Sequence, residues 1–257
     1  MNPLSLLRTE IVRRPIYNLL IVLLAVFGGN LGLAVIVLTL IIRFMMHGST
    51  KAGADMQKQM TNLQPKMNEI QEKYKDNPEK QSEEVMKLFK TQGAGPLKGC
   101  LTTLLQIPVF LWLLYTVKDF AENKVADGML YSFLTYFNIQ ISQVNPWFLG
   151  MNLLTPGNIA LTILAALLMY IQMTMMQWVQ PKPAVPATLT GGQATPDMAW
   201  MMKYMNYFFV FAMGSFVWSM PSAIGLYIIT TTIFGIVQQY MQYKELVNYK
   251  LKTLFWK

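Results

Sequence analysis

The chain has 257 residues, of which 53% are hydrophobic and 13% are charged. A soluble domain usually carries about 25% charged residues, so this composition excludes an ordinary soluble enzyme. The high hydrophobic content also excludes a disordered chain. The charge balance is basic, with 21 Lys and Arg against 13 Asp and Glu. The presence of one Cys and one His excludes an internal disulfide framework and most His-based metal sites.

Long uncharged stretches cover residues 15–42, 99–117, 128–181 and 204–243. A membrane-spanning helix needs about 20 apolar residues, and these runs are too many for buried core helices. The sequence therefore predicts a polytopic membrane protein. Proline and other turn-forming residues divide the runs, because a helix rises only about 1.5 Å per residue. The predicted spans are residues 31–49, 99–118, 157–178, 201–219 and 222–243.

Residues 1–30 allow more than one interpretation. The apolar run 16–27 ends at Gly28-Gly29-Asn30 and is too short to cross the membrane alone. Nearby arginines and the Gly-Gly-Asn break favour an interfacial helix on the extracellular side. One long tilted helix over 16–42 is the alternative. A secretory signal peptide is a third, although no cleavage site stands out.

Lysine distribution predicts the orientation of the chain. Nine lysines lie in residues 47–98 and four after residue 243, against one in 119–156. The positive-inside rule then places the hairpin region and the C-terminus in the cytoplasm. Five spans place the N-terminus outside. This topology makes residues 119–156 an extracellular segment, 179–200 a cytoplasmic loop and 244–257 a basic cytoplasmic tail.

The polar region 50–98 predicts an antiparallel helical hairpin. Its apolar residues recur at alternating four- and three-residue spacing, which is a heptad seam. They are Met56, Met60, Leu63, Met67, Ile70 and Tyr74. Pro78 follows the turn into a second helix at about 79–92, and Pro65 is expected to kink the first. Methionines suit adaptable contacts, so Met56, Met60 and Met67 are candidate contacts for a partner or the membrane surface. A solvated linker is the alternative.

Arg43 follows the twelve uncharged residues from Leu31 to Ile42 and is the most informative charge in the chain. An Arg at the centre of a membrane helix costs about 2.5–3.5 kcal/mol on insertion scales. Its side chain would either snorkel to the cytoplasmic headgroups or face a water-filled cavity. Thr39 lies one turn earlier on the same face. The predicted spans contain no acidic partner, which favours a hydrated pocket or an anionic ligand.

Other spans supply polar residues that would share such a cavity: Thr103, Gln106, Gln172 and Thr231. Hydroxyl and amide groups also link membrane helices without any further role, and that alternative stays open for each of them. Ser215 is a candidate nucleophile for an intramembrane protease, but the single histidine, His47, lies at a cytoplasmic helix end. The sequence therefore argues against a serine protease. It contains no phosphate-binding P-loop motif.

The order of several motifs resembles the YidC/Oxa/Alb family of membrane protein insertases. The motifs are Thr39-Leu-Ile-Ile-Arg43, Leu63-Gln64-Pro65-Lys66, Gly99-Cys100-Leu101, Gln106-Ile107-Pro108, and Pro221-Ser222-Ala223-Ile224-Gly225-Leu226-Tyr227. The likeness covers nearly the whole chain. It implies an all-α membrane protein in which five transmembrane helices surround a hydrophilic groove open to the cytoplasm. It also implies an extracellular interfacial helix and a cytoplasmic hairpin.

The resemblance implies a function that is not enzymatic and needs no cofactor, metal or nucleotide. The protein would insert and help fold transmembrane segments through its groove, in a bacterial inner membrane. Residues matching the family's groove positions are Arg43, Gln106, Gln172, Trp218 and Tyr227. Nascent membrane proteins and the lipid bilayer are the implied partners, with the Sec translocon and the ribosome as further ones. No small-molecule substrate is expected. A small anion channel or transporter that uses Arg43 is the alternative function.

Overall fold

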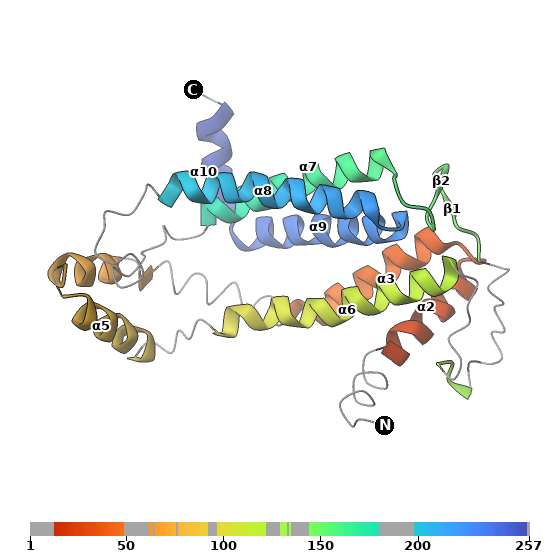
Figure 1. The fold of residues 1–257 in the computed structure, drawn as a ribbon, viewed down its shortest axis with the longest axis horizontal. Coiled ribbons are helices and arrows are strands. Elements are labelled where there is room, and N and C mark those ends of the chain that lie inside the picture. The colour runs from red at the N-terminus through yellow and green to blue at the C-terminus, as the bar shows by residue number, and fades with distance from the viewer. Residues whose placement is uncertain are drawn as a thin grey trace. The chain divides into compact units, whose positions relative to one another are not determined.

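A computed structural model describes most of the chain, and its elements are labelled in Figure 1. The described residues are 13–48, 62–63, 65–75, 77–91, 97–121, 129–132, 134, 144–179 and 198–255. Within these ranges, the side chains of residues 89, 97–107, 121, 198–203 and 254–255 lie outside the description.

The described elements are helical except for one short β-hairpin. They are α2 (Arg14–Val26), α3 (Leu31–Met45), α5 (Pro78–Thr91), α6 (Leu97–Ala121), β1 (Trp147–Phe148), β2 (Met151–Asn152), α7 (Ile159–Val179), α8 (Met198–Ser219), α9 (Ser222–Gln242) and α10 (Lys244–Phe255). The chain divides into two compact units. The first comprises Met1–Met46, Leu104–Gln172 and Val210–Gln238, and the second comprises His47–Thr103, Met173–Phe209 and Gln239–Lys257.

The chain breaks between α2 and α3 at the predicted glycines. Gly28 and Gly29 have φ angles of +59° and +84°, which side chains with a Cβ rarely adopt. Asn30 then caps α3, because its Oδ1 accepts a hydrogen bond of 3.0 Å from the Leu33 N–H. A single long helix over residues 16–42 is therefore excluded.

α2 belongs to the buried core of the first unit. Seven of its side chains are buried, and Leu20 and Leu24 are fully inaccessible. They join residues of α3, α6, α7 and α9 in one apolar cluster. The placement of residues 1–30 at the membrane interface stays a prediction, but α2 is not a lone amphipathic helix with an open apolar face.

Asn18 connects α2 to a distant part of the first unit. Its side chain is 3% exposed. Its Nδ2 donates to the carbonyl oxygens of Arg14 and Met129, both at 2.7 Å, and its Oδ1 accepts from the Tyr131 N–H at 2.8 Å. One amide side chain therefore satisfies three backbone groups.

Two of the arginines that favour an interfacial helix, Arg13 and Arg14, contact protein groups. Arg13 forms an ion pair of 3.3 Å with Asp119 and lies 5.4 Å from the centre of the Trp112 ring. Arg14 donates to the carbonyl oxygens of Met129 and Leu130. Both contacts join the start of α2 to residues more than 100 positions later, which sequence patterns could not indicate.

The segment 144–158, which contains the β-hairpin, joins the start of α3 to the start of α9 (Figure 1). At one end, Asn145 exchanges backbone hydrogen bonds with Gly29 and Leu31. At the other end, the carbonyl oxygens of Leu153 and Thr155 accept from the N–H groups of Ala223 and Ser222 at 2.8 and 2.9 Å. The segment therefore supplies acceptors for N–H groups that a helix leaves unpaired at its N-terminus.

Among the described helices, α7 and α9 are both long and apolar enough to cross a membrane. Only 17% of the most apolar window of α7 is buried, against 56% for α9, so α7 presents most of its apolar surface outward. α3 has 15 residues and is about 22 Å long, shorter than the predicted span 31–49. Helices also occupy the other predicted spans, and five membrane crossings stay a prediction.

The second unit contains the hairpin region. Asn77 accepts a hydrogen bond from the Lys80 N–H and Pro78 begins α5, so this helix starts as the sequence predicts. On the preceding helical residues, 62–63 and 65–73, the seam residues Leu63 and Met67 are buried at 6% and 7% exposure. The Gln81 side chain donates to the Gln71 carbonyl oxygen at 3.2 Å, which ties the two helical segments together.

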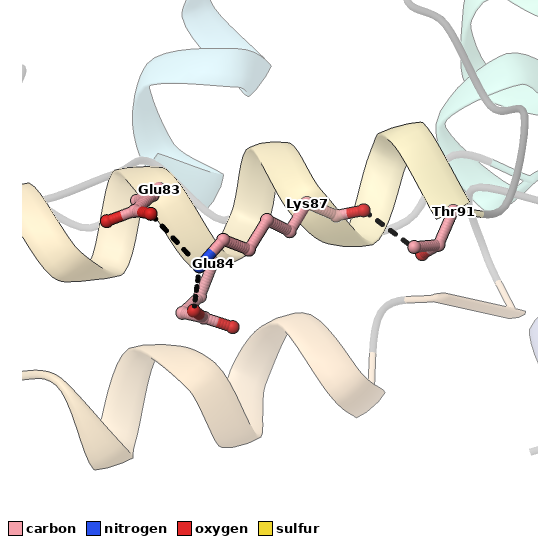
Figure 2. Close-up of polar contacts among 4 residues, drawn as sticks. All are labelled: Glu83, Glu84, Lys87 and Thr91. Carbon is pink, nitrogen blue, oxygen red and sulfur yellow. Dashed lines mark hydrogen bonds and ion pairs between the residues drawn. The ribbon is translucent and has the colours of Figure 1, made fainter.

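The outer face of α5 carries a small ion-pair network (Figure 2). Lys87 Nζ lies 2.8 Å from a Glu84 oxygen and 3.0 Å from a Glu83 oxygen. Hydrogen bonds with Glu84 and Glu83 raise the pKa of Lys87 above its ordinary value. All three side chains are largely exposed to solvent, so these ion pairs contribute little to stability.

The Asn18 contacts predict a large loss of stability on substitution. Asn18→Ala would leave the Tyr131 N–H without its partner and the Met129 carbonyl with only the longer bond from Arg14. A buried unsatisfied polar group costs about 1–3 kcal/mol. We expect a lower free energy of unfolding in detergent and faster hydrogen exchange at residues 129–131. Asn30→Ala removes one capping bond and should cost about 1 kcal/mol. Equal stability of Asn18→Ala and the wild type would contradict the structural role given to Asn18.

Candidate functional site

Arg43 lies in the last turn of α3, where the helix carbonyls favour a positive charge. Its side chain is half-buried, and in the described part of the chain its Nε is buried without a hydrogen-bond partner. The guanidinium lies close enough to Tyr227 of α9 for an electrostatic interaction. Arg43 therefore faces the protein and does not simply extend along the helix into water.

Phe44 fixes the end of α3 against α9. Its ring meets that of Phe234 edge to face, with 5.3 Å between the ring centres. Tyr227 lies two turns earlier on α9, is 3% exposed, and packs against Phe110 of α6 at 6.1 Å. Arg43 therefore faces the stretch of α9 that runs from Tyr227 to Phe234.

Thr231 lies within that stretch and differs from its two neighbours. Thr230 and Thr232 donate their hydroxyl protons to the carbonyl oxygens of Leu226 and Ile228, one turn earlier. The Thr231 hydroxyl oxygen is buried and has no hydrogen-bond partner among the described residues. Tyr227 and Thr231 are four residues apart, so they share one face of α9.

Gln172 of α7 reaches α9 at Gly235, directly after that stretch. A Cβ built at Gly235 would overlap the Gln172 side-chain nitrogen, so the amide lies directly against the glycine. The missing side chain at position 235 is what allows this approach. The polar side chains of Arg43, Gln172, Tyr227 and Thr231 thus gather along α9, and they come from α3, α7 and α9.

Two further predicted groove residues, Thr39 and Trp218, make other contacts. Thr39 is 1% exposed, and its hydroxyl donates to the Val35 carbonyl oxygen at 2.6 Å, so its proton is already used within α3. Trp218 lies at the end of α8, is 47% exposed, and accepts a backbone hydrogen bond from Gly157. It adjoins the start of α9, whereas the polar cluster lies further along that helix.

Four other candidates lie wholly or partly outside the described residues. Thr103 and Gln106 lie on α6, but their side chains are not described. Met56 and Met60 lie outside the described residues altogether. Met67 is buried in the hairpin, so a partner would have to separate the hairpin helices to reach it. Its role as a partner contact stays a prediction.

Sequence reasoning did not single out Gly235 or Phe110, although both shape the site. The signal for Gly235 was a glycine within an apolar helix, but only the fold shows that a glutamine from another helix fills the space. These features define a helical protein that carries helices capable of crossing a membrane, with a polar cluster among them.

Comparison with known proteins assigns the family. The model of the 60Kd inner membrane protein family matches residues 22–249, and the chain belongs to this family. It is 32% identical over 213 residues to the membrane protein insertase YidC of Wolinella succinogenes, a match that covers 83% of this chain and 33% of the relative. The predicted resemblance to the YidC family is thereby confirmed.

Two further relatives carry the same name. The membrane protein insertase YidC of Helicobacter pylori is 31% identical over 224 residues, which cover 87% of this chain and 35% of the relative. That of Haemophilus ducreyi is 28% identical over 242 residues, which cover 94% of this chain and 39% of the relative. The chain therefore spans between one third and two fifths of the length of these relatives.

The contact between Gly235 and Gln172 predicts a coupled pair of substitutions. Gly235→Ala would displace the Gln172 amide, and such overpacking should cost about 1 kcal/mol in unfolding free energy. Gln172→Ala in the same chain should remove that cost, which a double-mutant cycle in detergent would measure.

Gly214→Ala is the matched control, because a Cβ there meets only the Ala166 Cβ at an ordinary 3.8 Å. It should be neutral or stabilising, since alanine is the better helix former. Additive effects of the substitutions at positions 235 and 172 would show that the two residues are not in contact.

Proposed function

We propose that this chain is a membrane protein insertase of the bacterial inner membrane. The observation that carries the proposal is the cluster of Arg43, Gln172, Tyr227 and Thr231 along α9, in a chain whose relatives are named membrane protein insertases. Five helices would span the membrane, with the N-terminus outside and the C-terminus in the cytoplasm. The polar cluster would belong to a groove open to the cytoplasm and to lipid.

The unpartnered polar atoms in this cluster support a hydrated groove. A buried N–H or hydroxyl without a partner costs about 1–3 kcal/mol, so water or an entering polar segment would relieve the cost at Arg43 and Thr231. A hydrophilic stretch of a substrate entering the groove would exchange water for these groups. Its desolvation penalty would fall accordingly.

Arg43 would attract acidic residues in that hydrophilic stretch. The attraction exceeds its value in water because the surroundings have a lower dielectric constant. The substrate's apolar helix would then move into lipid along α7 and α9, driven by hydrophobic partitioning. The chemistry needs no bond breaking and no nucleotide, which makes the protein a chaperone-like insertase and not an enzyme.

The short α3 supports a locally thin membrane beside the groove. Its length of about 22 Å falls below the roughly 30 Å of a typical hydrocarbon core. A thinner apolar layer lowers the barrier for a polar segment without a pore. Nascent membrane proteins and lipid are the partners this mechanism requires, and the Sec translocon and the ribosome would act upstream of it.

The test uses purified protein in liposomes and a single-span substrate with a short acidic tail. Arg43→Ala should reduce insertion roughly tenfold, because a charge-assisted hydrogen bond contributes about 1.5–3 kcal/mol. Arg43→Lys should retain most activity, and Thr231→Val should lower insertion less than Arg43→Ala does. A substrate with a neutral tail should be inserted equally well by the wild type and by the Arg43→Ala variant.

Two controls separate the alternatives. Lys87→Ala removes one positive charge from the hairpin and should leave insertion unchanged. Equal insertion of the acidic tail by all Arg43 variants would mean that hydration alone drives the process. Failure of the wild type to exceed empty liposomes, combined with an anion current that requires Arg43, would replace the insertase with the channel alternative.

A further inference from the structure

The helix α10 begins where α9 ends. α9 closes at Gln242, the chain bends at Tyr243, and α10 runs from Lys244 to Phe255 (Figure 1). The Tyr240 hydroxyl donates a hydrogen bond of 3.3 Å to Asn248 Oδ1, which links the last turn of α9 to the first turns of α10. Tyr243 alone therefore separates the two helices.

The side chains of α10 combine positive charge with exposed apolar surface. Its described side chains include Lys244, Lys250 and Lys252 against one acidic residue, Glu245. Tyr249 is 63% exposed and Leu246 is 37% exposed, and the two share a face because they lie three residues apart. Val247 is buried at 2% exposure, so the helix packs on one side and leaves this face open.

The position of α10 follows from the length of α9. Twenty-one residues extend about 31 Å, which matches the thickness of a typical hydrocarbon core. If α9 crosses the membrane, the bend at Tyr243 lies at the headgroup level. A helix that starts there with lysines, a tyrosine and a leucine exposed has the composition of an interfacial helix.

We propose that α10 binds the surface of the bilayer through anionic lipid headgroups. Leu246 and Tyr249 would enter the headgroup region, and the lysines would pair with lipid phosphates, their stems lying along the apolar boundary. Docking would hold the end of α9 at a fixed depth. The proposal rests on the membrane crossing of α9 and not on insertase activity, so it stands or falls separately from the proposed function.

The experiment places an environment-sensitive fluorophore on α10 in the full chain. Cys100 is the one cysteine, so Cys100→Ser gives a clean background. Tyr249→Cys then carries the label in vesicles of phosphatidylcholine alone or mixed with phosphatidylglycerol. We expect a blue-shifted emission and quenching by lipid-attached quenchers in the mixed vesicles, and weaker effects in phosphatidylcholine alone.

Met86→Cys on α5 is the matched control, because Met86 is 55% exposed on a helix that adjoins no predicted span. Its label should report water in both vesicle types. Equal shifts at positions 86 and 249 would indicate non-specific adsorption and overturn the proposal. A label at position 249 that stays in water, or that responds only to added ribosomes, would also overturn it.

Charge substitutions test the role of the lipid phosphates. The pair Lys250→Gln and Lys252→Gln should weaken docking to the mixed vesicles by roughly fivefold for each lysine. The pair Lys87→Gln and Lys90→Gln on α5 removes the same charge and should leave docking unchanged. The assignment would be overturned if docking stayed the same after substitution of Lys250 and Lys252 and in vesicles without anionic lipid.

Discussion

The unpaired N–H groups at helix N-termini are the constraint on which the first unit depends. A helix cannot pair these groups internally, and where they are buried in protein they need protein acceptors. The segment 144–158 provides these acceptors for α3 through Asn145 and for α9 through Leu153 and Thr155. Asn158 caps α7 from the same segment, with a hydrogen bond of 3.0 Å from the Leu161 N–H. Three helices therefore start at one short stretch of chain.

This shared origin explains how residues distant in sequence come together. Arg43 lies twelve residues after the start of α3, and Gln172 and Gly235 each lie thirteen residues after the starts of α7 and α9. At about 1.5 Å per residue, each lies roughly 18–20 Å from the segment 144–158. The edge-to-face contact of Phe44 with Phe234 and the approach of Gln172 to Gly235 are the direct result. The position of the polar cluster along these helices is therefore fixed by the segment 144–158, where the helices start.

Local signals predicted much of this arrangement, and long-range contacts account for the rest. Gly28-Gly29-Asn30, Asn77-Pro78 and Pro221 mark helix boundaries because each acts on its own backbone, so helix positions followed from the sequence. The burial of α2 did not, because Asn18 depends on residues 129 and 131. The bond that the Thr39 hydroxyl makes within α3 is likewise seen only in the fold, and its place in a shared groove with Arg43 stays a prediction.

The contrast among the α9 threonines indicates what the polar cluster requires. The hydroxyl groups of Thr230 and Thr232 donate to backbone carbonyl oxygens of their own helix, which satisfies them at little cost in an apolar environment. Thr231 does not, and neither does the Nε of Arg43 within the described residues. A sequence selected only for packing would favour an apolar residue at both positions, since isosteric apolar replacement avoids the penalty. Thr231 on α9 and Arg43 on α3 therefore place two buried polar atoms along one stretch of α9 that no described residue satisfies.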